Sequence, residues 1–114
     1  MARFSSVQQL SPDGTNISGA TTSNALKTEA AKDARIYLDV ATVPGGGAIL
    51  DVFVQASADN VDFADILAFN QISATGKFVL AVKQEELGTF TRLRYVPSSG
   101  TFILGATLEK KQGV

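Results

Sequence analysis

The sequence contains no cysteine, no histidine and no tryptophan. Without cysteine the chain has no disulfide framework, no thiolate nucleophile and no thiolate metal site. Without histidine as well, the usual Ser-His-Asp and Cys-His catalytic sets are impossible and a zinc site is disfavoured. We therefore expect no enzyme activity, no catalytic residues, no cofactor and no metal. A chain without cysteine fits synthesis in a reducing cytosol and is also compatible with export.

Charge is scarce and balanced. Charged residues make up 18% of the chain and the net charge is −1, whereas soluble domains typically contain about 25% charged residues. Proteins that bind phosphate backbones usually carry a basic stripe, and none is present, so we do not expect a nucleic-acid partner. No apolar run approaches the ~18 residues that span a bilayer, and residues 1–20 hold no apolar signal-peptide core. We therefore expect no membrane partner.

What the sequence does contain is a set of short alternating apolar patterns. The central stretch RIYLDVATVPGGGAILDVFVQA, residues 35–56, has the period of two that is typical of strands with one buried face. Residues 44–47, one proline and three glycines, predict a chain reversal between its two strands, which we expect to be neighbours. The residues predicted to face inward are Ile36, Leu38, Val40, Leu50, Val52, Val54 and Ala56.

Further strand candidates follow this stretch, with turn signals at roughly 8–12-residue spacing. Six or seven short strands without intervening helices exclude a βαβ architecture. Residues 25–34 contain helix-forming residues, although a strand end followed by a loop fits them equally. We predict an all-β fold, an antiparallel β-sandwich or a jelly-roll-like barrel, as one domain over residues 31–114. The later strand candidates are residues 63–72, 77–82, 89–96 and 101–108. In the last two, alternation predicts one shared face for Thr91, Leu93 and Tyr95, and another for Phe102, Leu104, Ala106 and Leu108.

Residues 1–30 are predicted to form an extended N-terminal arm. Their many Ser, Thr, Asn and Gln residues cannot bury enough surface to order the segment by itself. Ordering the backbone costs about 1–2 kcal/mol per residue, more than the few apolar side chains return, so the arm must gain backbone hydrogen bonds at a sheet edge. We predict that it crosses to a neighbouring subunit or to a shell, the alternative being an edge of its own domain. Its sizeable apolar residues are Phe4, Val7, Leu10 and Ile17.

Several apolar residues fall on strand faces that should be polar. If Val52 and its inward partners are buried, then Ile49 and Phe53 face outward, and Tyr37 and Phe90 do so on their own strands. A half-exposed sheet is normally polar on its outer face, so a second layer is expected to cover these residues. That layer is the arm, the edge of another sheet or another subunit. This pattern indicates an assembling protein.

Two groups of charged residues are candidate binding sites. Arg92 and Arg94 share a strand face with Phe90, which fits a patch for sugar, phosphate or a partner's carboxylate, or a solvated strand face. Asp59, Asp62 and Asp65 are spaced three residues apart in the sequence. This spacing could provide paired catalytic carboxylates or the oxygen ligands of a calcium ion. A plain solvated turn is the favoured interpretation of the three aspartates, because Asp in turns bonds its own backbone.

Four segments of the chain share one pattern: DVFVQASADN (51–60), QISATG (71–76), LGTFTRLRY (87–95) and GTF (100–102). Together they resemble a pattern found in small all-β structural proteins of tailed bacteriophages. The resemblance covers about residues 36–108, with Asn60 where the family pattern has glycine. It implies a virion protein, and the role we favour is a head decoration (cement) protein on the capsid exterior, made in the host cytoplasm. It also implies two partners, the major capsid protein and the protein itself as a homo-oligomer, often a trimer.

The alternative function is a carbohydrate-binding sandwich module on a phage tail or fibre. Sugar sites usually present exposed aromatic rings, and this chain has no tryptophan and two tyrosines. Under either hypothesis the chain works by binding, and we expect its surface residues to carry the function. The predicted interaction residues are Phe4, Val7, Leu10, Ile17, Tyr37, Ile49, Phe53, Phe90, Arg92 and Arg94.

Overall fold

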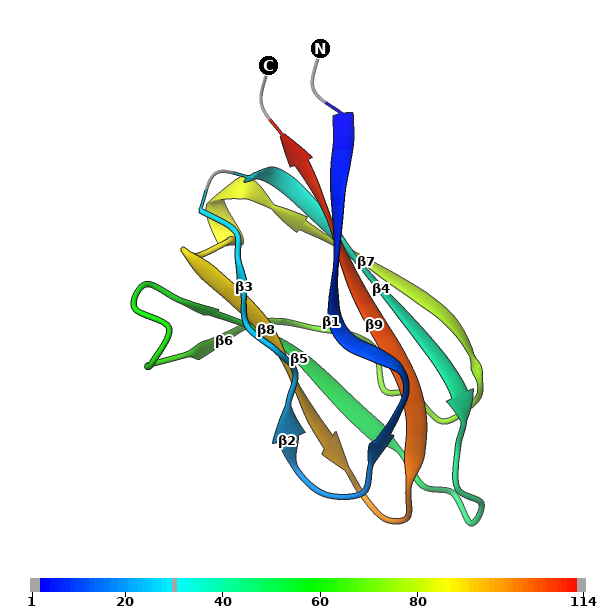
Figure 1. The fold of residues 1–114 in the computed structure, drawn as a ribbon. Helices are drawn as coiled ribbons and strands as arrows, with labels where there is room; N and C mark the ends of the chain where they lie inside the picture. The colour runs from blue at the N-terminus through cyan, green and yellow to red at the C-terminus, as the bar shows by residue number, and fades with distance from the viewer. Residues whose placement is uncertain (1–2, 30, 113–114) are drawn as a thin grey trace.

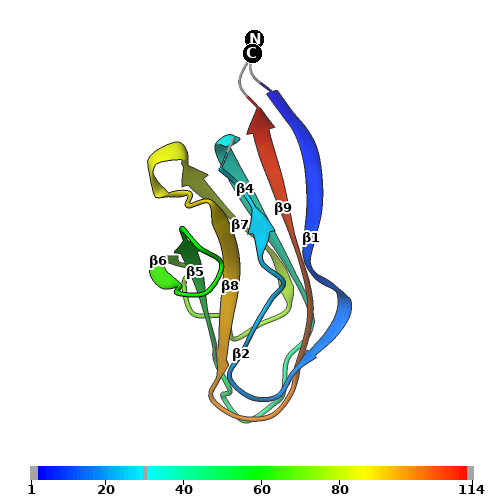
Figure 2. The same ribbon diagram turned by 60° about the vertical axis from the view of Figure 1, so that its left-hand side comes forward.

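The protein is a sandwich of two antiparallel sheets (Figures 1 and 2). The computed structural model describes residues 3–29 and 31–112. Within these residues there is no α-helix, and the one helical turn is the 3-10 element η1 (Gln84–Glu86). The predicted all-β sandwich is therefore confirmed. The helix considered for residues 25–34 is wrong, because backbone pairing with neighbouring strands outweighs the weak helix preference of so short a segment.

Each sheet is built from strands far apart in the sequence. Sheet A has the order β1-β9-β4-β7, so β1 and β7 are its edges. Its strands are β1 (Arg3–Ile17), β9 (Phe102–Gln112), β4 (Ala31–Thr42) and β7 (Gly76–Lys83).

Sheet B has the order β2-β8-β5-β6, and β3 also pairs with β8. Residues 3–27 thus supply three strands that the alternation in the sequence does not reveal. The described residues therefore form nine strands where we expected six or seven. The strands of sheet B are β2 (Thr21–Thr22), β3 (Leu26–Lys27), β8 (Phe90–Pro97), β5 (Leu50–Ser57) and β6 (Ala64–Ala68).

The turn at residues 44–47 joins the two sheets and not two neighbouring strands. β4 pairs with β7 and β9, whereas β5 pairs with β6 and β8. Gly46 and Gly47 have φ angles of +78° and +77°, the left-handed conformation that glycine adopts at low cost. The sequence predicted the reversal correctly, but our placement of these strands side by side was wrong, since turn chemistry does not determine the partner of each strand.

The core lies between the sheets and contains most of the residues that alternation predicts to face inward. These core side chains are no more than 1% exposed. Ala56, predicted on the same face, is only half-buried. Thr91 shares their inward direction, and its hydroxyl lies 2.8 Å from that of Thr28, so this buried polar pair is satisfied. The buried set is Ile36, Leu38, Val40, Leu50, Val52, Val54, Leu93, Tyr95, Phe102, Leu104, Ala106 and Leu108.

The predicted arm is built into the sandwich of its own chain. β1 pairs with β9 from Arg3 opposite Gln112 to Ile17 opposite Phe102. Leu10 and Ile17 are 0% and 2% exposed and belong to the core. The prediction that the described part of the arm crosses to a neighbour is therefore wrong, because β9 of the same chain offers the free sheet edge and the core offers the pockets.

Candidate functional site

Arg94, predicted as part of a binding patch, is engaged by side chains of its own sheet. Its Nη2 donates to Asp65 Oδ2 at 2.9 Å, and its guanidinium carbon lies 4.3 Å from the centroid of the Phe53 ring. The hydrogen bonds from Arg94 and then Gln55 hold the pKa of Asp65 below its ordinary value. Arg94 therefore covers Phe53, the outward-facing aromatic residue that we expected a second layer to cover.

Arg92, two residues before Arg94 on the same face of β8, is held in a similar way. Its Nε donates to Gln55 Oε1 at 2.8 Å, and its guanidinium carbon lies 3.8 Å from the centroid of the Phe63 ring. Gln55 Nε2 donates in turn to Asp65 Oδ1 at 2.9 Å, so one network spans β5, β6 and β8. On the outer face of sheet B, Arg92, Arg94 and Asp65 are thus engaged by neighbouring side chains.

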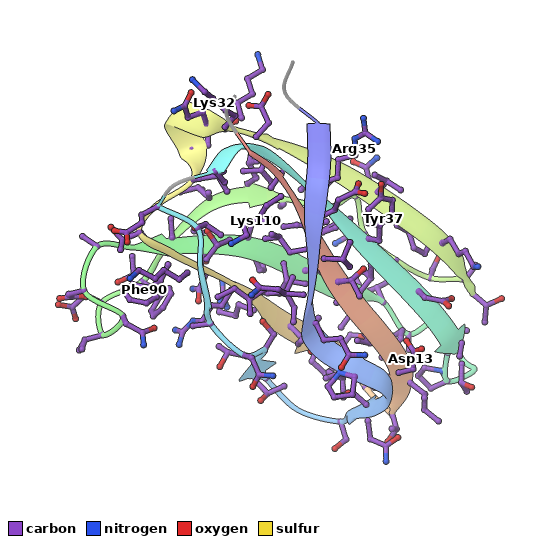
Figure 3. The ribbon with its side chains drawn as sticks, turned by 45° about the horizontal axis from the view of Figure 1, so that its top comes forward. Asp13, Lys32, Arg35, Tyr37, Phe90 and Lys110 are labelled. Carbon is purple, nitrogen blue, oxygen red and sulfur yellow. The ribbon has the colours of Figure 1, made fainter. Side chains whose placement is uncertain are left out.

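The remaining predicted residues do not gather into one patch. Figure 3 shows Tyr37 on β4 and Phe90 on β8, well apart and on different sheets. The half-buried Ile49 lies in the loop before β5, and Val7 is 64% exposed on β1. Backbone pairing places Phe4 opposite Lys111, but its side chain lies outside the described residues.

Two of the three aspartates at residues 59–65, Asp59 and Asp65, have structural roles. Asp59 Oδ1 accepts hydrogen bonds from the backbone N–H groups of Asp62 and Val61, both at 2.9 Å, and these bonds lower the pKa of Asp59. Asp65 pairs with Arg94, and Asn60 takes a φ of +63° in the turn. The backbone hydrogen bonds of Asp59 agree with the turn interpretation. In the described part of the chain, no group of three or more His, Cys, Asp or Glu residues could hold a metal ion.

One surface that the sequence did not reveal is the open edge of β7. This strand pairs with β4 alone among the described residues. Phe78 and Leu80 are half-buried beside the core, whereas Val79 points outward and is 56% exposed. A groove of about 400 Å³ separates residues 68–71 from residues 77–80 along this strand. The apolar run of residues 77–82 predicted the strand, but not its edge position.

A second concave surface lies on the outer face of sheet A. It is a depression of about 260 Å³ where β1 bends across β9 toward β4. Figure 3 shows Asp13 at this bend and Tyr37 on β4. The outward-facing side chains around it are Asp13, Tyr37, Asp39, Lys77 and Thr107.

Comparisons with known proteins assign no family. A scan against protein-family models finds no match to this chain, and a search of curated proteins finds none either. In the described residues, no helix has both the length and the apolar character needed to cross a membrane. We therefore derive a function from the two concave surfaces and from the sequence resemblance.

Proposed function

We propose that this protein is a structural virion protein of a tailed bacteriophage, a head decoration protein that binds capsid subunits and stabilises the shell. The observation that carries the proposal is the open edge of β7 with apolar side chains along it. The resemblance over residues 36–108 supports it as well, since those residues supply β4 to β9 of the sandwich.

An open strand edge is a docking site for another extended segment. It presents unpaired N–H and C=O groups, and soluble proteins usually cover such an edge or keep it short. β7 has eight residues, and the groove beside it can receive the side chains of an added strand. An extended segment of a capsid subunit would thus gain both backbone hydrogen bonds and apolar contacts.

The charges on β7 favour a strand of another protein, and not a second copy of this chain, as the partner at this edge. Lys77 and Lys83 lie near its two ends. In an antiparallel pair of two β7 strands centred on Leu80, each Lys77 would lie opposite a Lys83, which is destabilising. Carboxylates on the incoming strand would instead complement both lysines. The trimer that the resemblance implies would therefore use other surfaces of the sandwich.

The test is binding to capsids by two matched variants. Val79→Glu places a charge at the edge of β7, and Val61→Glu places the same charge on the turn after β5, where Val61 is 75% exposed. We expect Val79→Glu to abolish co-sedimentation with expanded empty capsids and Val61→Glu to bind as the wild type does. Equal binding by both variants would remove β7 from the interface. Cryo-electron microscopy of the virion without density for this chain would refute the virion assignment.

A further inference from the structure

Two rows of outward-facing residues cross sheet A at the depression. The strand register places Lys77 opposite Asp39, and Asp39 opposite Gly105. Two residues along the strands, Val79 lies opposite Tyr37, and Tyr37 opposite Thr107. Directly opposite side chains in a sheet are about 5 Å apart. Gly105 lacks a side chain, and Asp13 takes the space over it. The depression lies beside Asp13, among the polar side chains of these rows and the Tyr37 ring.

The bend of β1 completes this hollow with a carboxylate. The register with β9 shifts between Ser11 and Thr15, and Gly14 has a φ of +86°. Thr15 Oγ1 donates to the carbonyl oxygen of Pro12 at 2.5 Å and closes the bend. A Cβ atom on Gly105 would lie 3.0 Å from Asp13 Cα and would collide with the Asp13 carboxylate. Glycine at 105 thus permits Asp13 to lie over β9.

The polar groups around the depression are not engaged with one another. Among the described residues, the side chains of Asp13, Asp39, Lys77 and Thr107 form no hydrogen bond or ion pair. Tyr37 donates its hydroxyl to Glu109 Oε1 at 2.8 Å, which fixes the ring beside the depression. On sheet B, by contrast, the arginines, Gln55 and Asp65 bond one another. The free groups of sheet A are therefore available to a ligand.

We propose that this depression binds a single sugar ring, a neutral hexose or a hexosamine. Two carboxylates and a threonine hydroxyl accept bonds from sugar hydroxyls, Lys77 donates to sugar oxygens, and the Tyr37 ring lies against the apolar face of the sugar. The space of about 260 Å³ is below the ~300–1,000 Å³ of pockets for larger ligands, so it admits one ring. Two carboxylates against one ammonium disfavour sugar acids. This activity goes beyond the proposed capsid-binding function. The depression adjoins the β7 groove, since Lys77 and Phe78 line both.

The test is an NMR titration of the whole chain with glucose, galactose, glucosamine and glucuronate. We expect at least one of the first three sugars to shift the amide signals of Gly105 and Thr107, with a dissociation constant on the order of 1 mM. Glucuronate should bind about tenfold more weakly. Asp39→Asn and Tyr37→Ala should each weaken binding about tenfold or more, because each removes a direct contact. Asp62→Asn, at an aspartate on the turn after β5, is the matched control and should bind as the wild type does.

Three results would overturn the proposal. One is the absence of any shift at these amides with all four sugars at about ten times the expected dissociation constant. Another is glucuronate binding at least as tightly as the neutral hexoses. The third is equal loss of binding in Asp39→Asn and Asp62→Asn. A basic peptide that shifts these amides while no sugar does would assign the depression to a protein partner instead.

Discussion

A single buried hydroxyl pair joins β1 to the opposite sheet. The Ser11 and Tyr95 hydroxyl oxygens are 2.8 Å apart, and both side chains are buried. Burial raises the pKa of Tyr95 to about 12, although the bond to Ser11 partly opposes that effect. Because the folded-state pKa lies above the ordinary value of about 10, the neutral phenol favours the folded protein. Its contribution is complete below pH 10 and is lost as the pH rises from 10 through 12.

Tyr95→Phe tests this linkage directly. At neutral pH the variant should unfold with a free energy about 1 kcal/mol lower than the wild type, because Ser11 loses its partner. Between pH 10 and 12 the wild type should lose about 2–3 kcal/mol that the variant does not lose, so the difference should shrink or reverse sign. Urea denaturation at a series of pH values measures both effects. If the free energy of unfolding depends on pH in the same way for both proteins, then the pKa of Tyr95 is the same in the folded and unfolded states, which contradicts the prediction.

The sequence pattern predicts the inward direction of Tyr95 but does not identify Ser11 as its partner. The alternation of residues 89–96 correctly predicted that Thr91, Leu93 and Tyr95 share a face, and all three are buried. Ser11 lies in a polar segment without period, and 84 residues separate it from Tyr95. The same holds for the depression, where Gly105 and Asp13 meet only through the β1–β9 register. Local pattern predicts direction along a strand, whereas such contacts depend on strand pairing.

β1 shows the same distinction for a complete strand. Composition correctly predicted an extended segment that needs a sheet edge, but it could not choose between the edge of its own chain and that of a neighbour. The structure places Leu10 in the core, where it is 0% exposed, and leaves Val7 64% exposed on the same strand. β1 is therefore a structural edge strand with one buried face.

Deleting residues 2–20 should unfold the domain, since the deletion removes Leu10, Ile17 and the backbone partners of β9. Leu10→Ala alone should lower the free energy of unfolding by about 2–5 kcal/mol. Val7→Ser, on the same strand, should change it by no more than about 0.5 kcal/mol. Circular dichroism melts of the three variants provide the comparison. A truncated protein that melts at the wild-type temperature would show that β1 adds nothing to the stability of the sandwich.

The two ends of the described chain lie together at one end of the sandwich (Figure 2). They meet because β1 and β9 pair from Arg3 opposite Gln112 onward. Closing this contact joins segments about one hundred residues apart, which is the kind of contact that slows the folding of all-β proteins to milliseconds or seconds. The last strand of sheet A to find its place should therefore be β1.

A circular permutant tests that order of assembly. A short glycine linker from residue 112 to residue 3 would turn β1 and β9 into a hairpin, with new ends opened between Gly46 and Gly47 in the exposed connection of the two sheets. The loop-closure cost should fall by about 2–3 kcal/mol, so the permutant should fold faster and melt cooperatively with unchanged far-ultraviolet circular dichroism. Stopped-flow refolding measures the rate.

The control is a permutant opened between Val52 and Phe53, in the middle of β5. It should fail to fold cooperatively, because β5 pairs with strands on both sides and Val52 is fully buried.

If the permutant opened at Gly46 also fails, then the connection at residues 44–47 is itself part of the stable structure. Its close packing at Pro44 beside Gly100 would then be the contact to examine. Refolding at the wild-type rate would instead mean that β1 docks after the slow step, which the linker leaves unchanged.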